Sequence, residues 1–363
     1  MFNSHFFKAY ILPGITFQSI VISGGYCTGQ EIVQYFLTSG PVNGFYGLLI
    51  TTLIWSFICS LCFLLAKAYH AYDYKTFFKV LLGRGWVIFD LCYLYMVMIA
   101  LSVIAASVGS MLQELLGIPY NFGLILPLLY IMVMVFKGSE HIAKMFSYLS
   151  LVLYIVFIAF LMCCYQKSEI NFLPESLAAP SGTDWIKKGI TYACYNLGCV
   201  PAILFTLRNF KTDKQAVISG LLAGPFASIP AILLFMALLT EYPAVLNTTV
   251  PSTYMLEKLA IPLLTLTFSI VLISTLVETG VGLVHAFNER ISQHRTHNVT
   301  SPYWQYAAVG VLLIVVYSLS QFGLVNLIVQ GYGLLTWIML GVFILPLLTL
   351  GIFKISRRQQ ELI

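Results

Sequence analysis

The chain consists of long apolar stretches separated by short clusters of polar residues. A helix that crosses a bilayer needs about 20 mostly apolar residues. Long runs without Asp, Glu, Lys or Arg therefore predict about ten spanning helices, and the last run, 58 residues long, has room for two of them. Among these uncharged runs are 32–66, 91–113, 115–136, 145–166, 189–207, 215–240, 259–277 and 296–353.

Proline, glycine and charge clusters mark the boundaries between the predicted helices. They indicate an all-α polytopic membrane protein with two five-helix halves. The first half would cover 1–165, and the second, 166–363, would begin with an external loop and end in a short cytoplasmic tail. The predicted spans are 8–38, 44–68, 84–116, 119–136, 140–165, 184–209, 212–241, 262–290, 302–321 and 325–352.

Composition supports a membrane protein and excludes other classes. Hydrophobic residues make up 59% of the chain and charged residues only 9%. Soluble proteins average roughly a quarter charged residues, so a soluble enzyme, a nucleic-acid binder and a disordered protein are all excluded.

The basic residues predict the orientation of the chain. With the N-terminus inside, 15 of the 19 Lys and Arg residues fall in cytoplasmic segments. Because Lys and Arg concentrate on the cytoplasmic side, we expect both termini in the cytoplasm of a bacterial inner membrane. The basic residues left outside are Lys167, Lys187, Lys188 and Lys258.

Two connecting segments have helical patterns of their own. Inside, His70–Leu82 mixes lysines with aromatic residues, which is typical of a helix lying on an anionic leaflet. Outside, Pro251–Ile261 predicts a short helix that could act as a lid.

The first span contains a glycine-rich interruption at Ser23–Gly29. Three glycines in six residues fit a continuous helix poorly. Thr28-Gly-Gln-Glu31 matches a capping box, so we expect a new half-helix to start after Thr28. Alternatively, Glu31 contacts a substrate or an ion directly, because a glutamate within a span is usually functional.

The sixth span contains a second interruption, at Tyr195–Pro201. Pro201 removes a backbone donor and clashes with the preceding turn. Either feature alone could be simple packing, with the glycines forming a close-contact face and Pro201 kinking its helix. Together they lie at corresponding positions of the two halves, a pattern that indicates a transporter built from inverted repeats.

Five plus five spans with breaks in the first and sixth resemble the LeuT-type fold of the amino acid–polyamine–organocation transporters. The stretch Gly24-Gly-Tyr-Cys-Thr-Gly-Gln-Glu-Ile-Val-Gln-Tyr-Phe36 also resembles the YkvI-type bacterial membrane proteins. This resemblance implies that the two breaks face each other near the membrane midplane. The substrate-binding residues would then be Ser23, Gly24, Gly25, Tyr26, Cys27, Thr28, Tyr195, Asn196, Gly198 and Cys199, with Gly29, Glu31 and Pro201 as caps or gates.

Span eight carries a candidate cation site. In LeuT-type sodium symporters, adjacent hydroxyl residues on this span complete a sodium site with carbonyls of the first break. Ser274 and Thr275 match that pattern, with carbonyls from Val21, Gly24 and Val271, and oxygen ligands suit a small cation. Alternatively, the two hydroxyls simply bond back to their own helix.

Glu278 offers a second coupling scheme. A buried carboxylate can bind and release a proton, so Glu278 could be a proton carrier. It could instead pair with Lys144 or His285.

The sequence has no P-loop and no hydrolase or metalloenzyme motif. We therefore expect no enzyme activity, no catalytic residue and no cofactor apart from a bound Na⁺, with the bilayer and a small solute as partners. The leading hypothesis is a Na⁺- or H⁺-coupled secondary transporter of an amino-acid-like or zwitterionic solute. The alternative is a non-transporting receptor on the same fold, like the permease-like subunits of germinant receptors.

Overall fold

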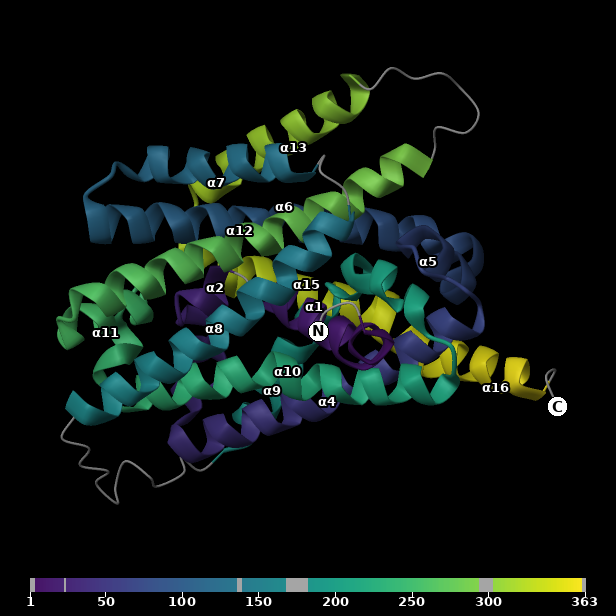
Figure 1. Ribbon diagram of the computed structural model, residues 1–363, viewed down its shortest axis with the longest axis horizontal. Helices are drawn as coiled ribbons and strands as arrows, with labels where there is room; N and C mark the ends of the chain where they lie inside the picture. Colours follow the sequence, from purple (N-terminus) through teal and green to yellow (C-terminus); the bar gives the residue numbers. More distant parts are fainter. Residues whose placement is uncertain (1–3, 23, 136–138, 168–181, 294–302, 361–363) are drawn as a thin grey trace.

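The computed structural model describes residues 4–22, 24–135, 139–167, 182–293 and 303–360, and every regular element in these ranges is helical. Most of the helices run along the long axis of the molecule and form an elongated bundle (Figure 1). The apolar runs of the sequence therefore form helices, as their lengths predict.

The observed helices begin and end within a few residues of the predicted spans. The first half contains a π-helix Phe7–Ile11, α1 Leu12–Val21, α2 Gly24–Cys27, α3 Gln30–Tyr35, α4 Pro41–Ala68, α5 Tyr74–Leu82, α6 Trp86–Leu116, α7 Tyr120–Val135 and α8 Ser139–Lys167. The second half contains α9 Asp184–Leu197, a 3₁₀ segment Val200–Asn209, α10 Asp213–Leu239, α11 Pro251–Leu259, α12 Pro262–Gln293, α13 Tyr303–Ser320, α14 Leu324–Asn326, α15 Tyr332–Met339 and α16 Ile352–Gln360.

Several helices are long and apolar enough to cross a membrane. Within the described ranges five helical stretches meet this condition, and a sixth does if α9 and the bent segment after it form one span. Three shorter apolar helices, within α7, α8 and α13, accompany them. The five stretches are Pro41–Ala68, Tyr74–Leu116, Asp213–Leu239, Pro262–His285 and Leu324–Arg358.

The chain is interrupted between α1 and α3. α1 ends at Val21, and Ile22 leaves the helical region with ψ of 73°. After the short α2, Gly29 adopts φ of 81°, a left-handed conformation that other L-residues adopt only at a cost. The backbone therefore leaves helical geometry twice, at Ile22 before α2 and at Gly29 after it.

A second interruption follows α9. The axis turns by 62° between α9 and the Val200–Asn209 segment. That segment is a ten-residue 3₁₀-helix, much longer than the three or four residues usual for this geometry, and Pro201 lies in its first turn. Runs of this kind often mark a hinge or a strained site.

The two halves contact each other in exchanged pairs. α1 contacts α10, and α4 contacts α9; α6 contacts α13, and α12 contacts α7. Within the halves, α1 contacts α8 just as α9 contacts α15. Each of these three contacts therefore has a counterpart between the helices at the same places in the predicted order of the other half.

Small and hydroxyl residues join α4 to α10. A Cβ added at Gly220 would lie 2.4 Å from backbone atoms of Ser60, so the two helices touch through their backbones. The hydroxyls of Ser56 and Ser60 donate to the carbonyls of Leu221 and Val217. Close approach and interhelical hydrogen bonds replace the hydrophobic driving force that helices lack inside a bilayer.

The predicted internal helix exists as α5, but it does not present its apolar face to lipid. Phe77 and Phe78 are fully buried and pack on Phe343, and Phe78 stacks on Phe89. The expected contact of this face with a leaflet is therefore wrong. The aromatic face is buried against the bundle because α5 is followed directly by α6 and folds back on it.

Candidate functional site

The residues of the first interruption are enclosed by the bundle. Tyr26, Cys27 and Thr28 are each fully buried. Gly24 and Gly25 begin α2, while Ser23 lies outside the described residues. This segment is packed on all sides by protein, as backbone outside regular helices must be at membrane depth.

The observed start of α3 differs from the predicted capping box, because its N-cap residue is Gly29 rather than Thr28. Glycine has no side chain that could cap the helix. A capping box needs an extended residue immediately before the helix, but Thr28 lies in a turn that follows α2. The Thr28 hydroxyl accepts a 3.4 Å hydrogen bond from the Gln30 N–H.

Glu31 instead reaches the second interruption. The hydroxyl of Tyr195 donates a 2.7 Å hydrogen bond to Oε2 of Glu31, and both side chains are buried. Tyr195 lies in the last turn of α9, where the chain is about to bend. This contact joins the two interrupted segments across 164 residues of sequence.

Aromatic rings surround this hydrogen bond. Tyr195 stacks on Tyr332 at a centroid distance of 4.5 Å and an interplanar angle of 18°. Tyr35 and Tyr192 approach the Tyr195 ring at 5.7 Å and 5.5 Å. Three tyrosines from α3, α9 and α15 therefore pack around the Tyr195 ring, whose hydroxyl binds the buried carboxylate.

The remaining predicted residues of the second interruption contact their own segment and α6. The Asn196 side-chain amide donates to the Tyr192 carbonyl at 3.0 Å. Gly198 is tightly enclosed, because a Cβ there would lie 2.7 Å from the sulfur of Met96. Cys199 is also buried. The structure therefore brings Tyr195 to the first interruption and turns the Asn196 amide back onto α9.

The predicted lid forms a helix and contacts the first interruption. The Ser252 N–H in the first turn of α11 donates a 2.9 Å hydrogen bond to the Thr28 carbonyl. A Cβ at Gly29 would lie 3.1 Å from the Cβ of Pro251 and 3.3 Å from Leu238. α11 thus lies directly on the turn that precedes α3.

On α12, the hydroxyls of Ser274 and Thr275 bond to their own helix. Ser274 donates to the Ile270 carbonyl at 2.7 Å, and Thr275 donates to the Val271 carbonyl at 2.8 Å. Ser274 is half-buried, whereas Thr275 is buried. Of the two alternatives for this pair, the structure has the hydroxyls bonded within the helix.

Thr279, one turn further along α12, makes the contact with the first interruption. Its hydroxyl oxygen lies 2.8 Å from the Ser19 carbonyl and 2.9 Å from the Ile22 carbonyl. A third carbonyl, from Thr275, lies at 3.1 Å. One hydroxyl has one proton, so it can donate fully to only one of these three oxygens at a time.

Glu278 stands beside Thr279. Its side chain is 1% exposed, and within the described residues neither carboxylate oxygen has a hydrogen-bond partner. The expected pairing with His285 is not found there, and the side chain of Lys144 lies outside the described part. Cys27 interacts electrostatically with Glu31 and with Glu278, so two acids lie near the first interruption.

No known family model matches the chain. One curated relative is the uncharacterized membrane protein YkvI of Bacillus subtilis (strain 168), 24% identical over 208 residues. The match covers 56% of this chain and spans 58% of the relative's length.

Solved structures resemble almost the whole chain. A Na⁺-coupled sialic acid symporter, described in a substrate-bound outward-open state, has a TM-score of 0.66 at 13% identity, over 93% of this chain and 78% of its own. The protein has the LeuT fold. MhsT in complex with L-phenylalanine agrees, with a TM-score of 0.58 at 15% identity, over 93% of this chain and 86% of its own.

The predicted resemblance to the YkvI-type proteins and to the LeuT fold is therefore confirmed. The relative is a membrane protein and the apolar helices agree with it, so the chain is a multi-pass membrane protein. Both structural neighbours of the LeuT fold are transporters rather than enzymes.

Sequence reasoning missed several polar residues that the LeuT fold brings to the first helix. Thr279 is the most informative, and its signal was an acid–hydroxyl pair one turn after Ser274 and Thr275. The Tyr154 hydroxyl lies 2.7 Å from Oε1 of the buried Gln18 and 2.9 Å from the Phe226 carbonyl. A single glutamine or tyrosine in a span carries no such signal, because its partners come from distant helices.

Proposed function

We propose that the protein is a secondary transporter that moves a small amino-acid-like or zwitterionic solute by alternating access, coupled to Na⁺ or H⁺. The observation that carries this proposal is that two interrupted segments, from opposite halves of the chain, meet through the buried Tyr195–Glu31 hydrogen bond. A polar contact of this kind between two bent segments is costly to bury and can separate when a helix half rotates.

The proposed architecture has ten spans in two inverted repeats, 1–165 and 166–363. The exchanged helix contacts support it, since a two-fold relation between the repeats requires every contact to have such a counterpart. In this arrangement the interruptions after α1 and after α9 occupy equivalent positions near the midplane.

The proposed solute site lies between the residues of the two interruptions. It would be formed by Ser23–Thr28 on one side and Tyr195–Cys199 on the other. The carboxylates of Glu31 and Glu278 both act electrostatically on Cys27, and negative charge near the site favours a solute that carries a cationic amine. The aromatic rings around Glu31 add a favourable surface for the same group.

The proposed coupling site is centred on Thr279. Three carbonyl oxygens converge within 3.1 Å of its hydroxyl, which has a single proton to offer them. Oxygen atoms gathered in this way suit a small cation such as Na⁺. The adjacent buried Glu278 needs either that cation or a proton, because an unpaired charge is costly to bury.

The proposed closure involves α11. Its hydrogen bond from Ser252 to Thr28 holds it on the turn before α3, on the side of Glu31. Opening that side would break this contact together with the one between Glu31 and Tyr195. Movement of the lid and movement of α3 are thus coupled through the turn at Thr28 and Gly29, which also borders the proposed solute site.

A ligand screen tests this function. Purified protein is heated with amino acids, amines and nucleobases in Na⁺ and in K⁺, since a ligand of the native state raises the unfolding temperature. Hits are then tested for uptake into proteoliposomes with and without a Na⁺ or pH gradient. Gradient-driven uptake supports the transporter, whereas binding without any uptake favours the receptor.

A further inference from the structure

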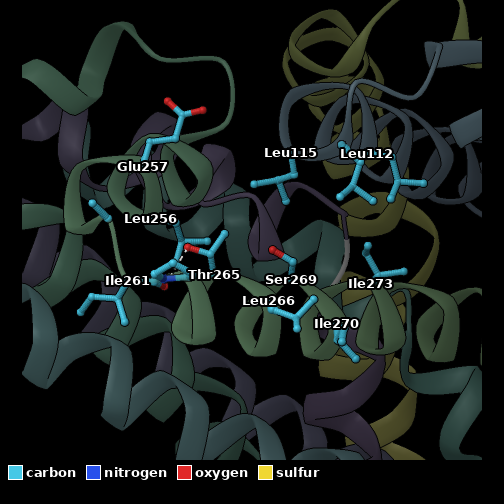
Figure 2. A pocket seen from close by; sticks show the side chains of 13 residues that line it. Leu112, Leu115, Leu256, Glu257, Ile261, Thr265, Leu266, Ser269, Ile270 and Ile273 are labelled. Carbon is cyan, nitrogen blue, oxygen red and sulfur yellow. Dashed lines mark hydrogen bonds between the residues drawn. The ribbon is translucent and has the colours of Figure 1, made fainter.

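A cavity of about 590 Å³ opens away from the two interruptions, between the end of α6, the lid helix α11 and the start of α12. Leucine and isoleucine side chains from these helices project into it (Figure 2). Its wall includes the buried Leu256 of the lid and the partly buried Leu112 of α6 and Ile273 of α12. The lid helix α11 therefore contacts the turn beside the proposed solute site through its first residues and lines this cavity through Leu256.

The mouth of the cavity is continuous with the lipid-facing surface. Leu116, Leu266 and Ile270 line it and are 66%, 59% and 56% exposed. Leu263, on the same helix but outside the cavity, is 75% exposed. Apolar side chains that are this exposed on membrane-spanning helices face the hydrocarbon of the bilayer. Lipid acyl chains therefore cover this surface and also lie at the mouth of the cavity.

One polar group lies within these apolar walls. Ser269 is 7% exposed and lines the cavity, and within the described residues its hydroxyl has no hydrogen-bond partner. Figure 2 shows that hydroxyl among the leucines. It lies seven residues, or about 10 Å, along α12 from Pro262, within reach of the ester carbonyls of a lipid at this end of the membrane.

The charges at the edge of the cavity are negative. Glu257 stands at this edge, and its carboxylate interacts electrostatically with that of Glu114. Of the nearby lysines, Lys258 pairs with Glu241, and Lys167 donates to the Leu259 carbonyl; neither is among the residues that line the cavity. The charged side chain that lines it is that of Glu257, which favours a headgroup that carries an amine.

We propose that this cavity binds one acyl chain of an amine-bearing phospholipid, such as phosphatidylethanolamine. The chain lies against the leucines, an ester carbonyl accepts a hydrogen bond from Ser269, and the ammonium lies near Glu114 and Glu257. Lipid tails are as apolar as the walls, so selectivity comes from packing, the hydroxyl and the charges rather than from the hydrophobic effect. A bound chain also contacts Leu256 and braces the lid.

Photo-crosslinking tests this site without any transport measurement. The protein is reconstituted in vesicles with a phosphatidylethanolamine that carries a diazirine on one acyl chain, and labelled peptides are mapped by mass spectrometry. We expect labels on 112–116 and 256–273 to exceed those at Ile314, an equally lipid-exposed residue of α13. A phosphatidylglycerol probe should label the cavity less.

Two variants and a matched control sharpen the result. Ser269→Phe should fill the cavity and abolish the excess labelling, and Ser269→Ala should lower it about threefold, the effect of one membrane hydrogen bond. Leu263→Phe adds the same ring on the same helix outside the cavity and should change nothing. If Ser269→Phe fails to fold, Ser269→Ala decides. Labelling no higher than at Ile314, or equal labelling by both lipids, would overturn the proposal.

Discussion

Thr279 and Ser274 lie five residues apart on α12, yet their hydroxyls have different partners. Ser274 bonds to its own helix, whereas Thr279 also contacts the Ser19 carbonyl in α1 and the Ile22 carbonyl at the start of the first interruption. The sequence identifies both as hydroxyl residues in a span. Which one meets the interruption depends on the rotation and depth of α12 relative to α1.

A prediction at the residue scale follows for the cation. Thr279→Val keeps the shape of the side chain but removes the oxygen at which three carbonyls converge. We expect ligand affinity to lose its dependence on Na⁺, which isothermal titration across a Na⁺ series measures. A pH series is the companion measurement, because a dependence on pH that survives in Thr279→Val would indicate proton binding at Glu278 instead.

Ser274→Ala serves as the control for Thr279→Val, because it removes a half-exposed hydroxyl bonded within the helix. It should leave the ion dependence unchanged and alter stability by no more than about 0.5 kcal/mol. An ion dependence that vanished in Ser274→Ala and survived in Thr279→Val would contradict the proposed site.

The buried pair Glu31 and Tyr195 gives a second prediction at this scale. Tyr195→Phe keeps the ring stacked on Tyr332 and deletes the hydroxyl that donates to the carboxylate. A hydrogen bond to a charged group contributes about 1.5–3 kcal/mol, so the free energy of unfolding should fall by about that amount. Chemical denaturation measures it, and unchanged stability together with unchanged ligand affinity would count against this closure.

At the scale of elements, α3 and α11 are short helices whose positions depend on each other. α3 begins at Gln30, and the left-handed backbone of its N-cap residue Gly29 lies against the first residues of α11. The sequence predicted both a half-helix after Thr28 and a helical lid, and both elements exist. Their contact was not predictable, because more than 200 residues separate them.

Gly29→Ala tests that contact. The substitution places a Cβ 3.1 Å from Pro251 and imposes a left-handed alanine, which costs about 1–2 kcal/mol. Gly117→Ala is the matched control, since Gly117 also has a left-handed φ, of 66°, but nothing within 4 Å of an added Cβ.

Both glycine variants should be less stable in thermal unfolding, because alanine adopts the left-handed backbone conformation only at a cost. Only Gly29→Ala should also make α11 more accessible to hydrogen exchange, because only there does the new methyl group press on the lid. Equal exchange of α11 in the two variants would argue against a lid that rests on Gly29.

At the scale of the whole molecule, the distribution of basic residues predicts the orientation. Cysteines introduced near Lys211 should react with membrane-impermeant maleimide only from the cytoplasmic side, and cysteines near Asn247 only from outside. The physical reason is that Lys and Arg are retained on the cytoplasmic side during insertion. A single reversed loop would contradict the ten-span layout.

The packing of the whole bundle also shows where sequence patterns stop being informative. The apolar face of α5 predicted contact with a lipid leaflet, yet Phe77 and Phe78 pack on protein. A hydrophobic face indicates burial without specifying the partner, because lipid and protein interiors are equally apolar. The same ambiguity hides the cavity beside α11, whose leucines are indistinguishable in sequence from core leucines.

The sequence by itself predicted a helical membrane protein, the approximate bounds of its apolar helices and the two places where the chain leaves regular helix. These depend on local properties: the length of apolar runs, glycine and proline, and the placement of charge. Only the tertiary structure decided that Glu31 meets Tyr195, that Thr279 rather than Ser274 reaches the first interruption, and that the Ser269 hydroxyl is buried in an apolar cavity. Each of these contacts joins segments far apart in the chain, or depends on how helices rotate against one another, and no local pattern encodes that rotation.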